Sequence, residues 1–366
     1  MPSSNPYNFG PHEMAVAPSN GQVIYIGTTN QGIYKSIDGG TSWLGRVDRN
    51  SYDCSGRLVD TNAFGVASGR NWALAVDPGN PDIVYTTAGF GHIQGVWKST
   101  DGGVSWRQKL CPGSVRQSGG IQGDIGAIHI DPNNPLHLLV ATHSAWQGGG
   151  YTGGDSGLYE STDGGESFSP HAPTAFPGVG THLWVSFLGR RDDGNVDTEG
   201  RYWILNSQTG GAWRTTDAGA SWQAVNWVPA GRRTKSHAGS GLYRSRANVL
   251  YLGFDYLVGR SEDNGRTWRD ANLPQGPDGY AGIVGDGTYI YAMPSNTGLS
   301  TTFSNTGIGA PFMYSLESDG TQWAPYNDQR FSNGPLRMAF DPVRRQVFAV
   351  MWCAGVWRLS VGVPGP

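Results

Sequence analysis

The phrase Ser36-Ile-Asp-Gly-Gly-Thr-Ser-Trp43 decides the fold, because the chain repeats it. Four further copies are Ser99-Thr-Asp-Gly-Gly-Val-Ser-Trp106, Ser161-Thr-Asp-Gly-Gly-Glu-Ser-Phe168, Thr215-Thr-Asp-Ala-Gly-Ala-Ser-Trp222 and Ser261-Glu-Asp-Asn-Gly-Arg-Thr-Trp268. A sixth, shorter copy is Ser318-Asp-Gly-Thr-Gln-Trp323. Most follow a short strand-like run, at intervals of roughly forty to sixty residues, which is typical of a repeated sheet unit.

The chemistry of the phrase predicts a tight turn. The Asp carboxylate accepts backbone N–H groups, Gly or Asn tolerates positive φ, and the Ser or Thr hydroxyl adds a local bond. The aromatic residue begins the outgoing strand, where its ring suits packing between neighbouring sheets. We therefore expect the Asp residues to be structural and the six aromatic residues to be packing groups rather than a ligand platform.

Composition places the chain in the all-β class. It has 366 residues, with Gly 56, Pro 22, Trp 14, Tyr 16 and only 15% charged residues, and no amphipathic helical stretch stands out. No low-complexity linker divides it, so a single domain, 1–366, is predicted. A net charge of -3 without a basic stripe argues against nucleic acid, and no apolar run is long enough to span a bilayer.

Counting strands and turns gives seven repeats near 12–46, 71–109, 124–169, 182–225, 238–270, 280–325 and 334–360. We predict a single seven-bladed β-propeller with four-stranded antiparallel blades. The last repeat offers three good strands, so residues near Tyr7 are expected to supply its fourth strand and close the fold without an edge.

Strand alternation puts the Asp phrases on one face and the long connections on the other. The long connections span 44–70, 110–123, 142–157, 226–239 and 294–312, and such loops usually carry binding sites. Cys54 and Cys111 fall on adjacent connections of this face, so we predict that they form a disulfide. The start of the chain lacks an apolar signal core; a secreted protein with its signal peptide removed is expected.

The Asp phrases resemble the Asp-box, or BNR, repeats of sialidases and xyloglucan-specific endoglucanases, most closely over residues 71–168. Those endoglucanases use two propellers with an acid on each, whereas this chain has one. Where their first blade places an Asp, this sequence reads Thr28-Thr29-Asn30-Gln31-Gly32, and Asn cannot transfer a proton. The Arg-Ile-Pro segment typical of sialidases is absent, which disfavours a standard sialidase.

A single seven-bladed unit with histidines on its loop face also resembles uronate-specific polysaccharide lyases, including enzymes that release rhamnose-capped glucuronate. In β-elimination, a base removes the proton beside the uronate carboxylate, while cations or amides neutralise that carboxylate. Six histidines are mapped to the loop face or its channel: His12, His92, His143, His171, His182 and His237. Neutral His suits the base near pH 7, and His92 and His143, just after second strands, are predicted to be catalytic.

The remaining site predictions concern substrate binding. Arginines and amides suit a carboxylate, and aromatic rings suit sugars. The predicted binding residues are Asn30, Arg70, Asn71, Arg116, Asp124, Trp146, Tyr151, His182, His237, Tyr256 and Arg330.

Two other functions are weighed against the lyase. A glycoside hydrolase needs two carboxyl groups, for which Asp124, Asp255 and Asp48 are available. A non-catalytic glycan-binding or assembly propeller is equally compatible with the fold. We expect a monomer with a polysaccharide or oligosaccharide substrate. No cofactor is expected, and because no calcium-loop spacing occurs, no metal residues are assigned.

Overall fold

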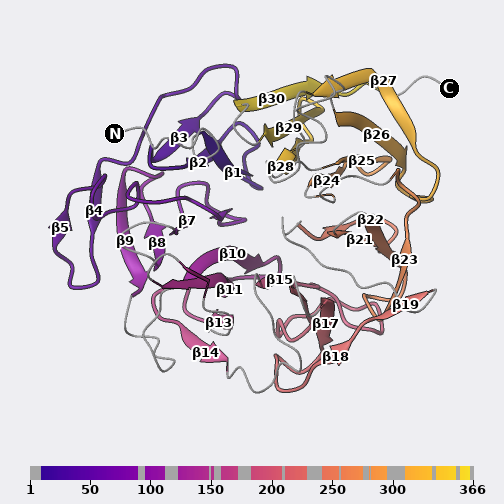
Figure 1. The fold of residues 1–366 in the computed structure, drawn as a ribbon, viewed down its shortest axis with the longest axis horizontal. Helices are drawn as coiled ribbons and strands as arrows, with labels where there is room; N and C mark the ends of the chain where they lie inside the picture. The colour runs from indigo at the N-terminus through magenta and orange to yellow at the C-terminus, as the bar shows by residue number, and fades with distance from the viewer. Residues whose placement is uncertain are drawn as a thin grey trace. The chain divides into compact units, whose positions relative to one another are not determined.

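The structure, a computed structural model, describes residues 10–89, 95–111, 123–147, 150–151, 158–171, 183–207, 211–228, 241–254, 257–274, 280, 282–294, 310–331, 335–351 and 355–362. This part of the chain contains strands and no helix, and its strands form seven sheets. The predicted fold class is confirmed: an all-β, seven-bladed β-propeller (Figure 1). No helix in these ranges is long and apolar enough to cross a membrane.

The chain forms two compact units, and the unit His12–Gln223 holds the first four blades. Blade 1 is β1 (Pro11–Val16), β2 (Ile24–Thr28) and β3 (Ile33–Ser36). Blade 2 is β4 (Asn50–Tyr52), β5 (Leu58–Val59), β6 (Leu74–Val76), β7 (Val84–Ala88), β8 (Gly95–Ser99) and β9 (Ser105–Leu110). Blade 3 is β10 (Gly123–Asp131), β11 (Asn134–Gln147), β12 (Gly150–Tyr151), β13 (Leu158–Ser161) and β14 (Ser169–His171). Blade 4 is β15 (Leu183–Phe187), β16 (Trp203–Ser207), β17 (Gly211–Thr215) and β18 (Gln223–Ala224).

The unit Ala224–Pro366 holds the other three blades. Blade 5 is β19 (Asn226–Val228), β20 (Tyr243–Arg244), β21 (Leu250–Phe254), β22 (Leu257–Ser261) and β23 (Thr267–Asp270). Blade 6 is β24 (Gly282–Gly285), β25 (Tyr289–Met293), β26 (Ala310–Leu316) and β27 (Ala324–Phe331). Blade 7 has three described strands, β28 (Pro335–Asp341), β29 (Gln346–Met351) and β30 (Gly355–Ser360). Tyr7, expected to close this blade, lies outside the described residues.

The five full-length Asp phrases form the predicted turn from their own hydrogen bonds. In blade 1, the Ser36 hydroxyl donates to Asp38 Oδ1 (2.9 Å) and accepts from Gly40 N (2.8 Å). Asp38 also accepts the backbone N–H of Ser42 (2.8 Å) and its hydroxyl (2.5 Å). These bonds from Ser42 lower the pKa of Asp38 to about 2. The same pattern recurs around Asp101, Asp163, Asp217 and Asp263.

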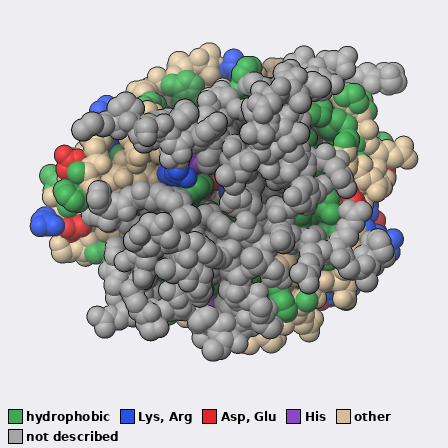
Figure 2. Space-filling view, viewed as in Figure 1, with side chains coloured by type: hydrophobic (Ala, Val, Ile, Leu, Met, Phe, Trp, Pro, Cys, Tyr) green, Lys and Arg blue, Asp and Glu red, His purple; other side chains and the backbone are tan. Residues whose placement is uncertain are grey.

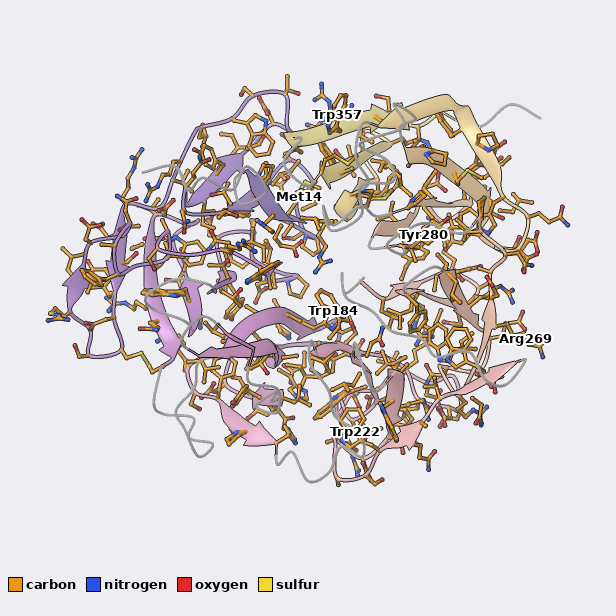
Figure 3. All side chains as sticks on the ribbon, viewed as in Figure 1. Met14, Trp184, Trp222, Arg269, Tyr280 and Trp357 are labelled. Carbon is orange, nitrogen blue, oxygen red and sulfur yellow. A yellow bond between two sulfur atoms is a disulfide. The ribbon has the colours of Figure 1, made fainter. Side chains whose placement is uncertain are left out.

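Three of the aromatic residues after the turns are buried, and one, Trp43, is exposed. Trp106 and Trp268 are fully buried, and Trp222, labelled in Figure 3, is buried as well. The indole N–H of Trp106 donates to Gly103 O (2.8 Å), inside its own turn. Trp43 is 36% exposed, so the prediction is wrong there. Its chain segment pairs with β3 only through Leu44 and Val47, not as a regular strand.

Tyrosines on second strands join three of the blades to the next blade within the same unit. The Tyr25 hydroxyl donates to Pro81 O (2.9 Å), and the Tyr85 hydroxyl donates to Gly164 O (2.8 Å). In the other unit, the Tyr251 hydroxyl donates to the backbone carbonyl of Glu317 (3.1 Å). Each bond satisfies a buried hydroxyl and a turn carbonyl together, so the blade spacing is set by repeated polar contacts as well as by apolar packing.

Two segments expected to be loops add strands to the outer side of a blade. Within 44–70, β4 pairs in parallel with β9, placing Ser51 opposite Trp106. Within 226–239, β19 pairs in parallel with β23. The loop prediction is wrong for these residues, since they cover outer strands that present unpaired N–H and C=O groups. The predicted disulfide is confirmed: Cys54, after β4, is bonded to Cys111, after β9.

Candidate functional site

Backbone hydrogen bonds bring together the ends of β2 and β7 in the unit His12–Gln223. Arg70 forms one antiparallel bridge with Thr29, which follows β2, and another with Gly89, which follows β7. Arg70 N donates to Gly89 O (2.7 Å), and Asn30 N donates to Gly69 O (3.0 Å). The segments that carry Asn30 and Arg70, two of the predicted binding residues, therefore lie side by side.

Asn71 holds this junction rather than presenting its side chain to a ligand. The side chain is fully buried, at 0% exposed. Its Nδ2 donates to the carbonyls of Val66 (3.1 Å) and Thr87 (3.0 Å), and its backbone N–H donates to Thr28 O (3.1 Å). The expectation that Asn71 contacts substrate directly is corrected to a positioning role, because both amide hydrogens are used within the fold.

Arg70, Trp72 and His12 form a stacked group beside Asn71. The Arg70 guanidinium lies 5.1 Å from the centroid of the Trp72 ring, within cation–π range. The His12 ring meets Trp72 edge-on, with centroids 4.9 Å apart and an interplanar angle of 67°. Arg70 and Trp72 are half-buried, whereas His12 is buried. Figure 2 shows basic, histidine and apolar side chains close together on the face in view.

Asn30 and Glu13 add an amide and a carboxylate to the same two blades. Asn30 is exposed and has a left-handed φ of 55° in the turn between β2 and β3, which Asn tolerates. Glu13 is buried in β1, next to His12, and its Oε1 accepts Met14 N (3.0 Å). Sequence reasoning missed Glu13, although a charged residue in a short apolar strand was a usable signal.

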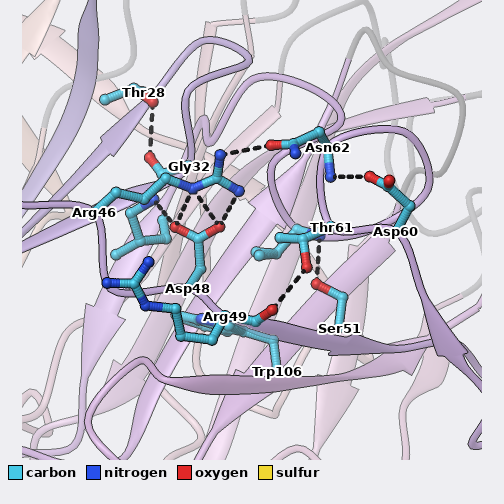
Figure 4. A network of polar contacts seen from close by, with 12 residues as sticks. Thr28, Gly32, Arg46, Asp48, Arg49, Ser51, Asp60, Thr61, Asn62 and Trp106 are labelled. Carbon is cyan, nitrogen blue, oxygen red and sulfur yellow. Dashed lines mark hydrogen bonds and ion pairs between the residues drawn. The ribbon is translucent and has the colours of Figure 1, made fainter.

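Asp48, one of the acids considered for hydrolysis, is a structural residue (Figure 4). Its side chain is fully buried and accepts Arg46 Nη2 (2.7 Å) and Ile33 N (2.7 Å). Arg46 also donates to Asn62 Oδ1 (2.5 Å), so Asp48 and Arg46 together join β3 to the segment that follows β5. A buried carboxylate held in this way supports the fold. Asp48 is therefore a structural residue, and the expectation that it is available as an acid for hydrolysis is corrected.

His171 and His137 share one carboxylate inside blade 3. Glu160 Oε1 lies 2.6 Å from His137 Nε2, and Glu160 Oε2 lies 2.8 Å from His171 Nε2. Both rings meet Trp203 of blade 4 edge-on. His171 was expected on the loop face, yet this pairing makes it part of the seam between two blades. His137 lies in β11.

His129 is a half-buried histidine that bonds to the neighbouring blade. Burial, which disfavours the charged ring, lowers its pKa to about 4. Its Nδ1 accepts the backbone N–H of Phe187 (3.1 Å), which requires an unprotonated nitrogen. His129 therefore joins blade 3 to blade 4 as a neutral acceptor.

Several predicted site residues lie wholly outside the described residues: His92, Arg116, His182, His237, Asp255 and Tyr256. Five others are placed by backbone register alone. Asp124 on β10 lies opposite Ser144 on β11, one residue from His143, and Trp146 lies opposite Tyr151 on β12. Arg330 lies on β27 in the other unit, opposite Pro311.

Among the described residues, no group of three or more His, Cys, Asp or Glu side chains is placed to hold a metal ion. The chemistry available from the described site is therefore that of Arg70, Trp72, His12, Asn30 and Glu13. Together they offer hydrogen bonds, an aromatic surface and one carboxylate.

Comparison with known proteins relates the chain to polysaccharide-degrading enzymes. No family model matches it. Over 236 residues it is 27% identical to a xyloglucanase from Paenibacillus sp, covering 58% of this chain and 20% of the relative. Over 323 residues it is 24% identical to a xyloglucanase from Hypocrea jecorina, covering 77% of this chain and 36% of the relative. The chain thus spans about a third of these relatives or less.

A solved structure supports the fold alone. The extracellular domain of a hybrid two component system from B. thetaiotaomicron aligns with a TM-score of 0.63 and 12% identity, covering 98% of this chain and 40% of that one.

The relatives overturn the prediction of a polysaccharide lyase. Both curated relatives described above are named xyloglucanases, which are glycoside hydrolases, and neither is a lyase. Elimination at a glucuronate, with His92 or His143 as its base, is therefore withdrawn. The hydrolase, weighed as an alternative from the sequence, is the reading that these relatives favour.

Proposed function

We propose that the chain is a glycoside hydrolase domain that acts on a plant β-glucan of the xyloglucan type. The observation that carries the proposal is sequence similarity to xyloglucanases over 236 to 323 residues. The stacked Trp72, flanked by Arg70 and exposed Asn30, supports it, because aromatic rings and planar polar groups are the usual partners of sugars.

Asp124 and Glu13 are the proposed acids. Hydrolysis with inversion or retention needs two carboxyl groups, one to protonate the leaving oxygen and one to activate water or attack the sugar. Asp124 begins the inner strand β10, and Glu13 lies near the start of the inner strand β1. His12, beside Glu13, contributes to binding rather than to proton transfer in this proposal.

An assay of reducing ends released from xyloglucan tests the proposal. We expect activity in the unaltered chain, loss of at least about a hundredfold in Asp124→Asn, and retained folding by circular dichroism. The matched control is Asp53→Asn, on the exposed hairpin between β4 and β5. Activity that survives in both Asp124→Asn and Glu13→Gln would reject these acids.

Glycan binding without cleavage is a second candidate, favoured by one observation. The exposed position in the β2–β3 turn carries Asn30. The Asn side chain has no ionisable proton, so it can bind a sugar but cannot act as a catalytic acid. Retarded migration in gels containing xyloglucan, with no new reducing ends, would identify a binding module. Loss of that retardation in Arg70→Gln would place the binding at Trp72.

We also propose that the protein works outside the cell. The disulfide between Cys54 and Cys111 supports this location, because such bonds persist mainly in oxidising compartments.

A further inference from the structure

Blades 2 and 5 carry matching rows of side chains across their outer strands, and the row in blade 5 is incomplete. In blade 2, register places Tyr85 opposite Lys98 and Lys98 opposite Arg107. In blade 5, it places Tyr251 opposite Arg260 and Arg260 opposite Arg269. Both rows therefore contain a tyrosine followed by two cations on one face of the sheet.

In blade 2, both cations of the row have partners. Lys98 Nζ lies 2.6 Å from Glu166 Oε1, a carboxylate supplied by the turn of blade 3. The Arg107 guanidinium lies 4.6 Å from the ring centroid of Tyr52, its register partner on the added strand β4. The charges of this row are thus balanced by the next blade and by the outer strand.

In blade 5, these partners are replaced. The residue opposite Arg269 on the added strand β19 is Val228, which has no ring. The acid bonded to Arg260 Nη2 is Glu262 of the same turn, at 2.9 Å, and its side chain is 66% exposed. Among the described residues, the Arg269 side chain has no hydrogen bond, ion pair or ring contact, and Arg260 Nε has no hydrogen-bond partner. Arg269 projects from β23 beside β19 (Figure 3).

A pocket lies at this incomplete row. Its volume is about 180 Å³, and its lining residues are Arg260, Glu262, Asp263, Thr267 and Arg269. Ordinary small-molecule sites measure roughly 300–1,000 Å³, so this pocket suits one small group. Asp263 is occupied by its own turn, where it accepts the Ser261 hydroxyl (2.9 Å) and Thr267 N (2.8 Å).

We propose that this pocket binds a small oxyanion group, either free or carried on a larger ligand. Like charges directly opposite each other on paired strands destabilise a sheet, and an anion between Arg260 and Arg269 removes that repulsion. Guanidinium groups present planar paired donors that match carboxylate, sulfate and phosphate oxygens. This site is independent of the proposed hydrolase activity, since all of its residues come from the turn and outer strands of blade 5.

Isothermal titration at fixed ionic strength tests the proposal with sodium sulfate, sodium glucuronate and neutral methyl glucoside as probes. We expect one saturable site for an oxyanion and none for the neutral sugar. Sulfate alone identifies a tetrahedral anion, glucuronate alone identifies a carboxylate, and binding of both identifies a general oxyanion site. Absence of saturable binding by either anion overturns the proposal.

Two variants distinguish anion binding in this pocket from nonspecific attraction by the overall charge of the protein. Arg269→Gln is expected to weaken binding about tenfold or more, the size of one lost charged hydrogen bond, without lowering Tm, because its side chain is exposed. Arg107→Gln, the matched change in blade 2, is expected to leave binding unchanged. Equal weakening in both variants would also overturn the proposal.

Discussion

Cys54 and Cys111 are bonded to each other across 57 positions of sequence, with their Cα atoms 6.0 Å apart. The bond joins the start of the β4–β5 hairpin to the residue after β9. β4 contributes only three residues to the sheet and β5 only two, and strands this short hold poorly by themselves. The disulfide therefore anchors an outer hairpin whose chain continues directly into Arg70 and Asn71.

Removal of the disulfide is expected to destabilise the fold. Closing a loop of this length restricts the unfolded chain by about 4 kcal/mol in the chain-entropy description. We expect Cys54→Ser with Cys111→Ser to lower the free energy of unfolding by about 2–4 kcal/mol, measured by urea denaturation. Added reductant should lower the free energy of unfolding of the unaltered chain to the same value. If reductant has no effect on that free energy, the role assigned to this bond is contradicted.

Trp106 and Trp43 occupy the same repeat position with different burial, so they make a matched pair. Trp106→Ala leaves a large cavity between blades and is expected to cost about 3–5 kcal/mol. Trp43→Ala removes a side chain that is 36% exposed and is expected to cost less than about 1 kcal/mol. Chemical denaturation of both variants checks this difference. Equal losses of unfolding free energy would show that the burial of the ring does not determine the cost of removing it.

The pairing of His137 with Glu160 predicts how stability depends on pH. Although burial opposes both charges, the hydrogen bonds and charges of Asp131 and Glu160 raise the pKa of His137 to about 9. Despite burial, the bonds from His137 and His171 lower the pKa of Glu160 to about 2. The contribution of this pair is thus lost as pH rises from about 6.5 through 9 and as pH falls from about 4.5 to 2.

Tm measured from pH 2 to pH 10 tests the effect of this pair. The contribution of the His137–Glu160 pair to stability should be largest between about pH 4.5 and 6.5 in the unaltered chain. Glu160→Gln should lower Tm within that window and flatten the decline on both sides. Glu262→Gln, at an exposed acid of blade 5, is the control. Identical pH profiles for Glu160→Gln and the unaltered chain would contradict the assignment.

Asn71 is expected to affect activity through position rather than contact. Asn71→Ala leaves the carbonyls of Val66 and Thr87 without their side-chain donor, at a cost of about 1–3 kcal/mol for a buried group left unsatisfied. We expect a lower Tm together with weaker glycan binding. Arg70→Gln, in contrast, should weaken binding with Tm nearly unchanged, and a large loss of Tm in Arg70→Gln would reverse this division of roles.

The fold was predictable from the sequence because its decisive unit is local. Asp38 and Ser42 are four residues apart, and the hydrogen bonds of the Asp38 carboxylate are made within one phrase. Repetition then fixed the number of blades. The disulfide was also predictable, since strand alternation places Cys54 and Cys111 on adjacent connections of one face.

The site was less predictable, because its contacts join distant segments. The sequence selected Asn30, Arg70 and Asn71 as binding residues, but only the structure shows that their segments lie side by side, that Asn71 is buried and that Trp72 and His12 contact Arg70 or each other. Asp48 looked like a free acid until Arg46 was seen to bind it. Ion pairs of this kind leave no periodic signal.

The sequence by itself determined the all-β repeat, the turn chemistry and the seven blades, since each depends on residues that are neighbours along the chain. The tertiary structure alone decided that β4 and β19 pair in parallel with β9 and β23, that Glu160 bridges two histidines, and that Arg269 lacks the aromatic partner that Arg107 has. Those relationships depend on which side chains meet across blades, where separation in sequence carries no information about distance in space.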